Sequence, residues 1–200
     1  MSQRSNPHQS LTPAPWVARF AALIAPDARV LDLASGYGRN SRYLAGLGHR
    51  VLAVDRDETA LAALATAALA TAAPRIETLH ADLEGAGWPL AGQTFDAVIV
   101  THYLHRPLFS HIAAALGPGA VLLYETFARG NEKHGRPSNP EFLLEPNELL
   151  DRFAGSLHVI AFEQGYVAQP FPAVVQRLCA VGRAREWPIT LPSARRDSIS

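Results

Sequence analysis

The hydrophobic residues of this chain fall into short runs that are separated by segments of helical periodicity. Branched and aromatic side chains are common in the short runs, and turn-forming or charged residues bound them, as is typical of strands. We therefore predict strands at 28–34, 49–55, 75–81, 95–101, 120–126, 157–164 and 173–182.

Between most of these runs, apolar positions recur every three or four residues, which predicts amphipathic helices. The predicted helices span 15–24, 40–47, 57–73, 105–116 and 146–153. Asp57 can cap the third helix through its carboxylate, and Gly117 is the expected stop of the fourth.

The order of these elements predicts the fold class. Strands that alternate with helices form a parallel sheet, and right-handed crossovers gather the carboxyl ends of the strands at one rim. The segment 165–172 is too short for a crossover helix, so the last two strands should form an antiparallel hairpin. We predict an α/β fold: a doubly wound, Rossmann-like sheet of seven strands, mostly parallel with an antiparallel last strand, and helices on both faces.

Length and composition limit the functions that this fold can have. Two hundred residues suit one domain, expected at 14–186 between a flexible arm at 1–13 and a flexible or loosely docked tail at 187–200. The 18 basic and 18 acidic residues balance, so the chain lacks the basic field of a protein that wraps a duplex. RNA stays an alternative partner through local arginines, namely Arg39, Arg42, Arg106 and Arg136.

Cysteine content and hydropathy limit the covalent links, metal sites and cellular location that we expect for this protein. Cys179 is the only cysteine, which excludes an intrachain disulfide and a cysteine-rich metal site, and we predict no bound metal. No apolar run approaches the length of a membrane span, and the first residues lack the apolar core of a signal peptide. We expect a cytoplasmic protein that does not bind a membrane; the sequence leaves its oligomeric state open.

The stretch VLDLASGYGRN, residues 30–40, is the main candidate for a binding site. Gly36 and Gly38 permit a tight turn between strand and helix, and the helix start offers free N–H groups. Asp55 ends the next strand, where its carboxylate can accept hydrogen bonds from a ribose diol. A dinucleotide and S-adenosylmethionine both fit this pattern.

Three features favour S-adenosylmethionine. Ser41 stands where the dinucleotide fingerprint has its third glycine. Asp82, followed by Leu83, ends the third strand, in reach of an adenine edge. The predicted antiparallel strand is absent from the six-strand dinucleotide fold.

With these residues, the chain resembles the class I, seven-stranded S-adenosylmethionine-dependent methyltransferases over residues 16–184. The Gly-Arg-Asn-Ser sequence at 38–41 is most similar to the tellurite-resistance-like branch of this family. The family has a glycine where this chain has Ala34, which adds a methyl group close to the cofactor. The resemblance implies cofactor contacts at Asp32, Ala34, Gly36, Gly38, Asn40, Asp55, Arg56, Asp82, Leu83 and Thr101.

The methyl acceptor should lie beyond the fourth strand, where the resemblance places the active site. His102, Tyr103 and His105 follow that strand and are the candidate catalytic residues with Tyr124. A histidine there could remove a proton, although methyl transfer from a sulfonium can proceed by alignment and desolvation alone. The long polar loop at 128–142 is a candidate lid, and the residues predicted to contact a small acceptor are Glu125, His134 and Arg136.

Two rival functions remain open from the sequence. A nicotinamide-dependent oxidoreductase would use the same glycine turn, but Ser41 and the lack of a separate substrate domain disfavour it. A non-catalytic domain that binds a cofactor or a partner is compatible with Ala34 and with the absence of an unambiguous catalytic base.

Overall fold

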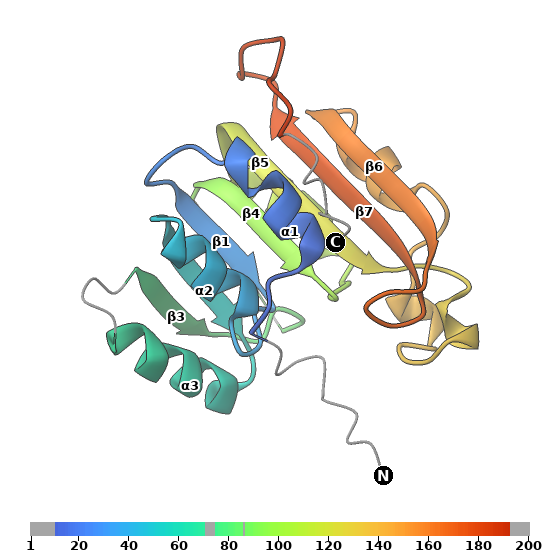
Figure 1. The fold of residues 1–200 in the computed structure, drawn as a ribbon, viewed down its shortest axis with the longest axis horizontal. Helices are drawn as coiled ribbons and strands as arrows, with labels where there is room; N and C mark the ends of the chain where they lie inside the picture. The colour runs from blue at the N-terminus through green and yellow to red at the C-terminus, as the bar shows by residue number, and fades with distance from the viewer. Residues whose placement is uncertain (1–10, 71–74, 86, 193–200) are drawn as a thin grey trace, which may run out of the picture.

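The computed structural model describes residues 11–70, 75–85 and 87–192. Their strands form one seven-stranded sheet in the order β3-β2-β1-β4-β5-β7-β6 (Figure 1). The strands are β1 (Arg29–Leu33), β2 (Arg50–Asp55), β3 (Ile76–His80), β4 (Phe95–Thr101), β5 (Leu116–Phe127), β6 (Leu157–Val167) and β7 (Ala173–Gly182).

The directions of the strands confirm the predicted fold class. The first five strands pair in parallel, whereas β7 is antiparallel to both of its neighbours, β5 and β6. The predicted hairpin of the last two strands is therefore present. It extends the parallel sheet beyond β5 with β7, the one strand of reversed direction.

Helices cover both faces of this sheet. Hydrophobic residues of α1 and α2 pack with one face, and those of α4 and α5 pack with the other. Figure 1 shows α1, α2 and α3 on the same side of the sheet. The helices are α1 (Pro15–Phe20), α2 (Arg39–Gly46), α3 (Glu58–Leu69), α4 (Leu108–Ala115) and α5 (Glu148–Phe153), with the short 3-10 helices η2 (Ala21–Leu23), η3 (Asn131–Lys133) and η4 (Pro140–Phe142).

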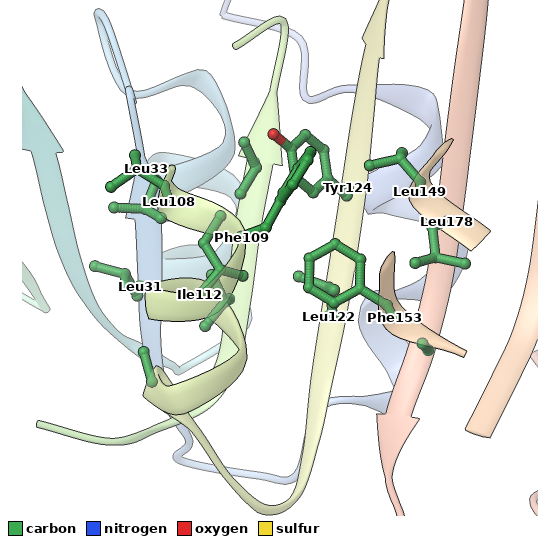
Figure 2. Packing of buried hydrophobic residues seen from close by; sticks show 14 of the residues in the cluster. Leu31, Leu33, Leu108, Phe109, Ile112, Leu122, Tyr124, Leu149, Phe153 and Leu178 are labelled. Carbon is green, nitrogen blue, oxygen red and sulfur yellow. The ribbon is translucent and has the colours of Figure 1, made fainter. Parts of the chain in front are cut away.

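The face covered by α4 and α5 holds the larger aromatic core (Figure 2). Tyr124 of β5 packs in this core against Phe109 of α4 and Phe153 of α5, with ring centroids 6.1 and 6.3 Å away. Leu31 and Leu122 lie on the same face and are fully buried. Because side chains alternate along a strand, Glu125 faces the opposite side of the sheet from Tyr124.

The starts of two elements, α4 and β5, differ from the prediction by three residues or more. Helix α4 begins at Leu108 instead of His105, since the ring of Pro107 disfavours helical geometry in the residue before it. Strand β5 begins at Leu116 instead of Ala120, and its pairing with β4 shifts register between Phe95 and Ala97. As a result, His105 lies in a loop.

Other predicted elements agree more closely. Asp57 is the N-cap of α3, where its carboxylate accepts a hydrogen bond from the Ala60 N–H at 3.0 Å. The helix ends at Leu69, and its predicted end at Ala73 lies outside the described residues. Most of the predicted N-terminal arm and residues 193–200 of the tail also lie outside them. The domain limits remain predictions.

Candidate functional site

The segment between β1 and α2 is a turn of left-handed residues. Ala34, Gly36 and Gly38 have φ angles of +52°, +53° and +72°. A Cβ atom on Gly38 would lie 2.4 Å from a methyl carbon of Leu64, whereas a Cβ on Gly36 would meet nothing within 4 Å. The turn therefore packs tightly on α3 at Gly38 and borders open space at Gly36. The φ of Ala34 explains why a glycine suits its position.

Asp55 joins this turn to the end of β2. Its two carboxylate oxygens accept hydrogen bonds from the N–H groups of Gly36 at 2.7 Å and Asp57 at 2.8 Å. Each oxygen has a second lone-pair direction that can accept from a ligand. Asp55 thus lies at the turn, and its contact with a ribose stays a prediction.

Asp32 is buried directly behind the turn. The Ser41 hydroxyl donates to its Oδ2 at 2.5 Å, and its Oδ1 is buried without a hydrogen-bond partner among the described residues. Burial raises the pKa of Asp32 to about 6, although the Ser41 hydrogen bond and the charge of Arg39 act in the opposite direction. Ser41, which stands where the dinucleotide fingerprint has its third glycine, therefore holds the Asp32 carboxyl group.

Asn40 and Thr101 connect three elements behind the same rim. The Asn40 side chain donates to the Thr101 hydroxyl at 3.0 Å and accepts from the Ala14 N–H at 2.9 Å. These bonds link the start of α2 to the end of β4 and to the entry of α1. The predicted cofactor contacts of Asn40 and Thr101 stay predictions.

The end of β3 carries the next acidic group along the rim. Asp82 is exposed and accepts a hydrogen bond from the Glu84 N–H at 3.0 Å, while Leu83 is buried beside it. Arg56, which follows β2, is exposed, and its carbonyl oxygen lies 3.2 Å from a ring nitrogen of His80. The adenine contacts predicted for Asp82 and Leu83 stay predictions.

Tyr103 lies on the same part of the rim as Asp82 and Glu84. Burial and the carboxylates of Glu84 and Asp82 raise the pKa of its hydroxyl above the ordinary value. A phenol held in its neutral form is a poor proton acceptor. The catalytic role predicted for Tyr103 does not fit this position.

His102 directly follows β4 and lines a pocket with Glu125. The pocket is lined by Pro15, Arg39, His102, Glu125, Phe127, Val167, Pro170, Phe171, Ala173, Val175 and Arg177. His102 has a φ of +56°, and its N–H donates to the Glu125 carbonyl at 2.8 Å. Its ring lies 5.0 Å from that of Phe127 and 6.1 Å from that of Phe171. Strained backbone of this kind is common at functional sites.

Glu125 provides the carboxylate of this pocket. Its Oε1 lies 3.7 Å from His102 Nε2, and its Oε2 accepts a hydrogen bond from Arg177 Nε at 2.5 Å. Arg177 also lies 3.4 Å from Glu163, which pairs with Arg19 of α1 at 2.7 Å. A row of ion pairs thus runs from the pocket across β7 and β6 to α1.

Arg177 and Phe171 are pocket residues that the sequence analysis missed. Arg177 follows directly from strand pairing, because it is the register partner of Glu125 in the antiparallel β5–β7 pair. The available signal was that Arg177 is the one charged residue in the mostly apolar run of β7. Phe171 gave no comparable signal, since it lies in a connection with two prolines.

The remaining predicted residues lie away from this pocket. Tyr124 is buried in the core, and its hydroxyl donates to the Tyr103 carbonyl at 3.1 Å, so a catalytic role does not fit it. His105 is half-buried in the loop before α4. His134 and Arg136 are exposed, and the His134 ring lies 5.0 Å from that of Tyr166 on β6. None of these four lines the pocket that contains Glu125.

The loop predicted as a lid is held by side-chain bonds near both of its ends. Arg106 forms two hydrogen bonds with Glu148, at 2.7 and 2.9 Å, and donates to the carbonyls of Glu141 and Leu143. Arg129 pairs with Glu145 at 2.7 Å. These bonds occupy Arg106, which is therefore a structural anchor and does not fit the predicted RNA contact.

Comparisons with known proteins agree with this geometry. Residues 30–119 match the sequence profile of the family described as "Methyltransferase domain". This segment of the chain is therefore similar to a methyltransferase domain. That match spans β1 to the start of β5 and includes the whole glycine turn.

Solved structures extend the likeness over more of the chain. TehB from Haemophilus influenzae is 21% identical with a TM-score of 0.69, over 82% of this chain and 60% of that one. A methyltransferase from Methanosarcina mazei is 16% identical with a TM-score of 0.66, over 86% and 98% of the two chains. The glycopeptide N-methyltransferase MtfA, complexed with S-adenosyl-L-homocysteine, is 17% identical with a TM-score of 0.58, over 81% and 86%.

The fold is therefore that of the class I, seven-stranded methyltransferases, as the resemblance predicts. The chain spans 60% of the length of TehB. A comparison with curated protein sequences gave no match. No helix within residues 11–70, 75–85 and 87–192 is long and apolar enough to cross a membrane.

Proposed function

We propose that this chain binds S-adenosyl-L-methionine at the rim formed by β1, β2 and β3, and transfers its methyl group to a small acceptor in the pocket beside His102. The observation that carries the proposal is the placement of Asp32, Asp55 and Asp82 on, or within two residues of, three successive strands around an open glycine turn. The methyltransferase domain match covers all three.

The residues at the rim fit the proposed cofactor. The open space at Gly36 admits a ligand against the backbone, and the unpartnered Oδ1 of Asp32 is a buried acceptor close to the turn. Asp55 retains lone pairs for two ribose hydroxyls. When bound, S-adenosylmethionine supplies a methyl group on a sulfonium, which is a good leaving group.

The pocket residues are suited to align an acceptor and to handle its proton. Phe127 and Phe171 are apolar lining residues against which an acceptor can be desolvated. His102 is the candidate proton acceptor, and Glu125 at 3.7 Å can orient its ring and stabilise its protonated form. Arg177 in turn holds the Glu125 carboxylate. Of the predicted catalytic residues, His102 is the one whose position supports this role.

The proposal is tested by isothermal titration calorimetry with S-adenosylhomocysteine and with NAD separately. We expect S-adenosylhomocysteine to bind. Replacement Asp55→Asn keeps an oxygen that can accept from the Gly36 N–H but loses the charge that favours a ribose diol, so affinity should fall about 10-fold or more.

Asp57→Asn is the matched control for this experiment. Asparagine caps helices as well as aspartate does, so α3 should keep its start and the affinity should stay unchanged. Absence of S-adenosylhomocysteine binding, or full affinity in Asp55→Asn, would contradict the proposal. Binding of NAD alone would instead support the oxidoreductase alternative.

A further inference from the structure

Arg39 is a half-buried arginine between the glycine turn and the pocket. It is the first residue of α2, directly after Gly38, and it lines the pocket with His102 and Glu125. Burial lowers the pKa of its guanidinium, while the charges of Glu125 and Asp32 raise it. The guanidinium charge therefore interacts with Asp32 behind the glycine turn and with Glu125 in the pocket.

Within the described parts of the chain, no hydrogen bond or ion pair joins the Arg39 guanidinium to another residue. Other partly buried arginines differ. Arg106 bonds Glu148 and two backbone carbonyls, and Arg177 bonds Glu125. Arg75 bonds Asp27 at 2.7 Å. A guanidinium that has lost part of its hydration normally regains it through an anion.

Within the described residues, the local fold gives the Arg39 guanidinium no bonded anion to compensate for its partial burial. The first turn of α2 has no acidic side chain, and a positive charge at a helix N-terminus opposes the helix dipole. Asp32 behind the turn is already bonded by Ser41. Glu125 is already bonded by Arg177, so the pocket lining of Arg39, Arg177 and Glu125 carries one excess positive charge when His102 is neutral.

We infer that Arg39 binds a carboxylate at the boundary between the glycine turn and the pocket. The inference rests on the proposed function, because two sources of that carboxylate follow from it. One source is the methionine part of the cofactor; the other is an acidic group on the acceptor, whose apolar body would lie against Phe127 and Phe171.

The first arm of the test compares two nucleosides by calorimetry. S-adenosylhomocysteine carries the amino-acid carboxylate, and 5′-methylthioadenosine lacks the whole amino-acid part. If the cofactor is the source, Arg39→Gln should weaken S-adenosylhomocysteine binding about 10- to 100-fold and leave 5′-methylthioadenosine unchanged, since a charge-assisted hydrogen bond is lost only in the former. Arg39→Lys should fall between, because it keeps the charge without the planar fork.

The second arm titrates benzoate and its neutral analogue benzyl alcohol into the protein saturated with S-adenosylhomocysteine. If the acceptor is the source, the wild type should bind benzoate more tightly than benzyl alcohol, and Arg39→Gln should remove that preference. Arg42→Gln is the control in both arms, since Arg42 is half-buried on the same helix but does not line the pocket.

Thermal unfolding checks that the variants fold. Arg39→Gln should unfold close to the wild-type temperature, because removing a cation from a helix N-terminus offsets the lost attraction to Asp32 and Glu125. The inference is overturned if Arg39→Gln leaves the affinities for S-adenosylhomocysteine and for benzoate unchanged, or if neither of these carboxylates binds. It is also overturned if Arg39→Gln weakens the binding of 5′-methylthioadenosine as much as that of S-adenosylhomocysteine. Failure of S-adenosylhomocysteine binding in the wild type would contradict the proposed function alone, because benzoate still tests Arg39 in the free protein.

Discussion

The two sides of the rim are built differently. On the turn side, hydrogen bonds join groups 9 and 19 positions apart, Ser41 with Asp32 and Gly36 with Asp55. On the pocket side, Arg177 bonds Glu125 across 52 positions, and Arg19 bonds Glu163 across 144. Backbone conformation therefore shapes the turn side, whereas paired charges on separate strands shape the pocket side.

This comparison predicts that the turn side is the more sensitive to an added methyl group. Gly38→Ala should lower the free energy of unfolding by about 3 kcal/mol, because the new Cβ combines an unfavourable positive φ with a clash against Leu64. Leu64 is fully buried and has little room to move. Urea denaturation monitored by circular dichroism measures the change.

Gly36→Ala is the matched control for that substitution. Its φ is similar, but its Cβ would enter open space, so we expect a loss of only about 1 kcal/mol. Equal losses in the two variants would show that packing on α3 does not set the turn. The difference between them isolates the contact with Leu64.

The pocket side should instead respond to the loss of a charge. Arg177→Met leaves the Glu125 carboxylate, whose side chain is 5% exposed, without its bonded guanidinium. We expect a loss of about 2 to 3 kcal/mol in urea denaturation, since removing one partner of a buried pair leaves an uncompensated charge.

The outer end of the same row supplies the contrast. Arg19→Met breaks a pair whose side chains are 51% and 44% exposed, and it should cost about 0.5 kcal/mol. The double variant Glu125→Gln/Arg177→Met should recover part of the loss, because both charges leave together. If the double variant lost more free energy of unfolding than Glu125→Gln and Arg177→Met lose together as single variants, the interpretation as a charge pair would be wrong.

The same contrast explains what could be predicted from the sequence. The fold class follows from alternating strand and helix patterns, and Gly36, Asp55 and Asp82 follow from local order along the chain. Arg177 could not be placed beside Glu125 without the register of an antiparallel pair that is distant in sequence. The sequence also could not choose which of two adjacent β5 residues faces the pocket, and a shift of one residue places Tyr124 in the core.

A pH titration can sharpen the comparison on the turn side. Burial raises the pKa of Asp32 to about 6, above its unfolded value of about 3.9, so the native state binds more protons than the unfolded state between these limits. The stability that Asp32 contributes is therefore full below pH 4 and is lost as the pH rises through 6.

Asp32→Asn removes this titration and should gain on the order of 2 kcal/mol relative to the wild type between pH 4.5 and 7.5, as measured by urea denaturation. Ser41→Ala should act in the opposite direction, because the Ser41 hydrogen bond lowers the pKa of Asp32. Its loss should steepen the decline in stability with pH. Parallel pH profiles for wild type and Asp32→Asn would mean that Asp32 stays ionised in the fold, held by Ser41 and Arg39 in spite of its burial.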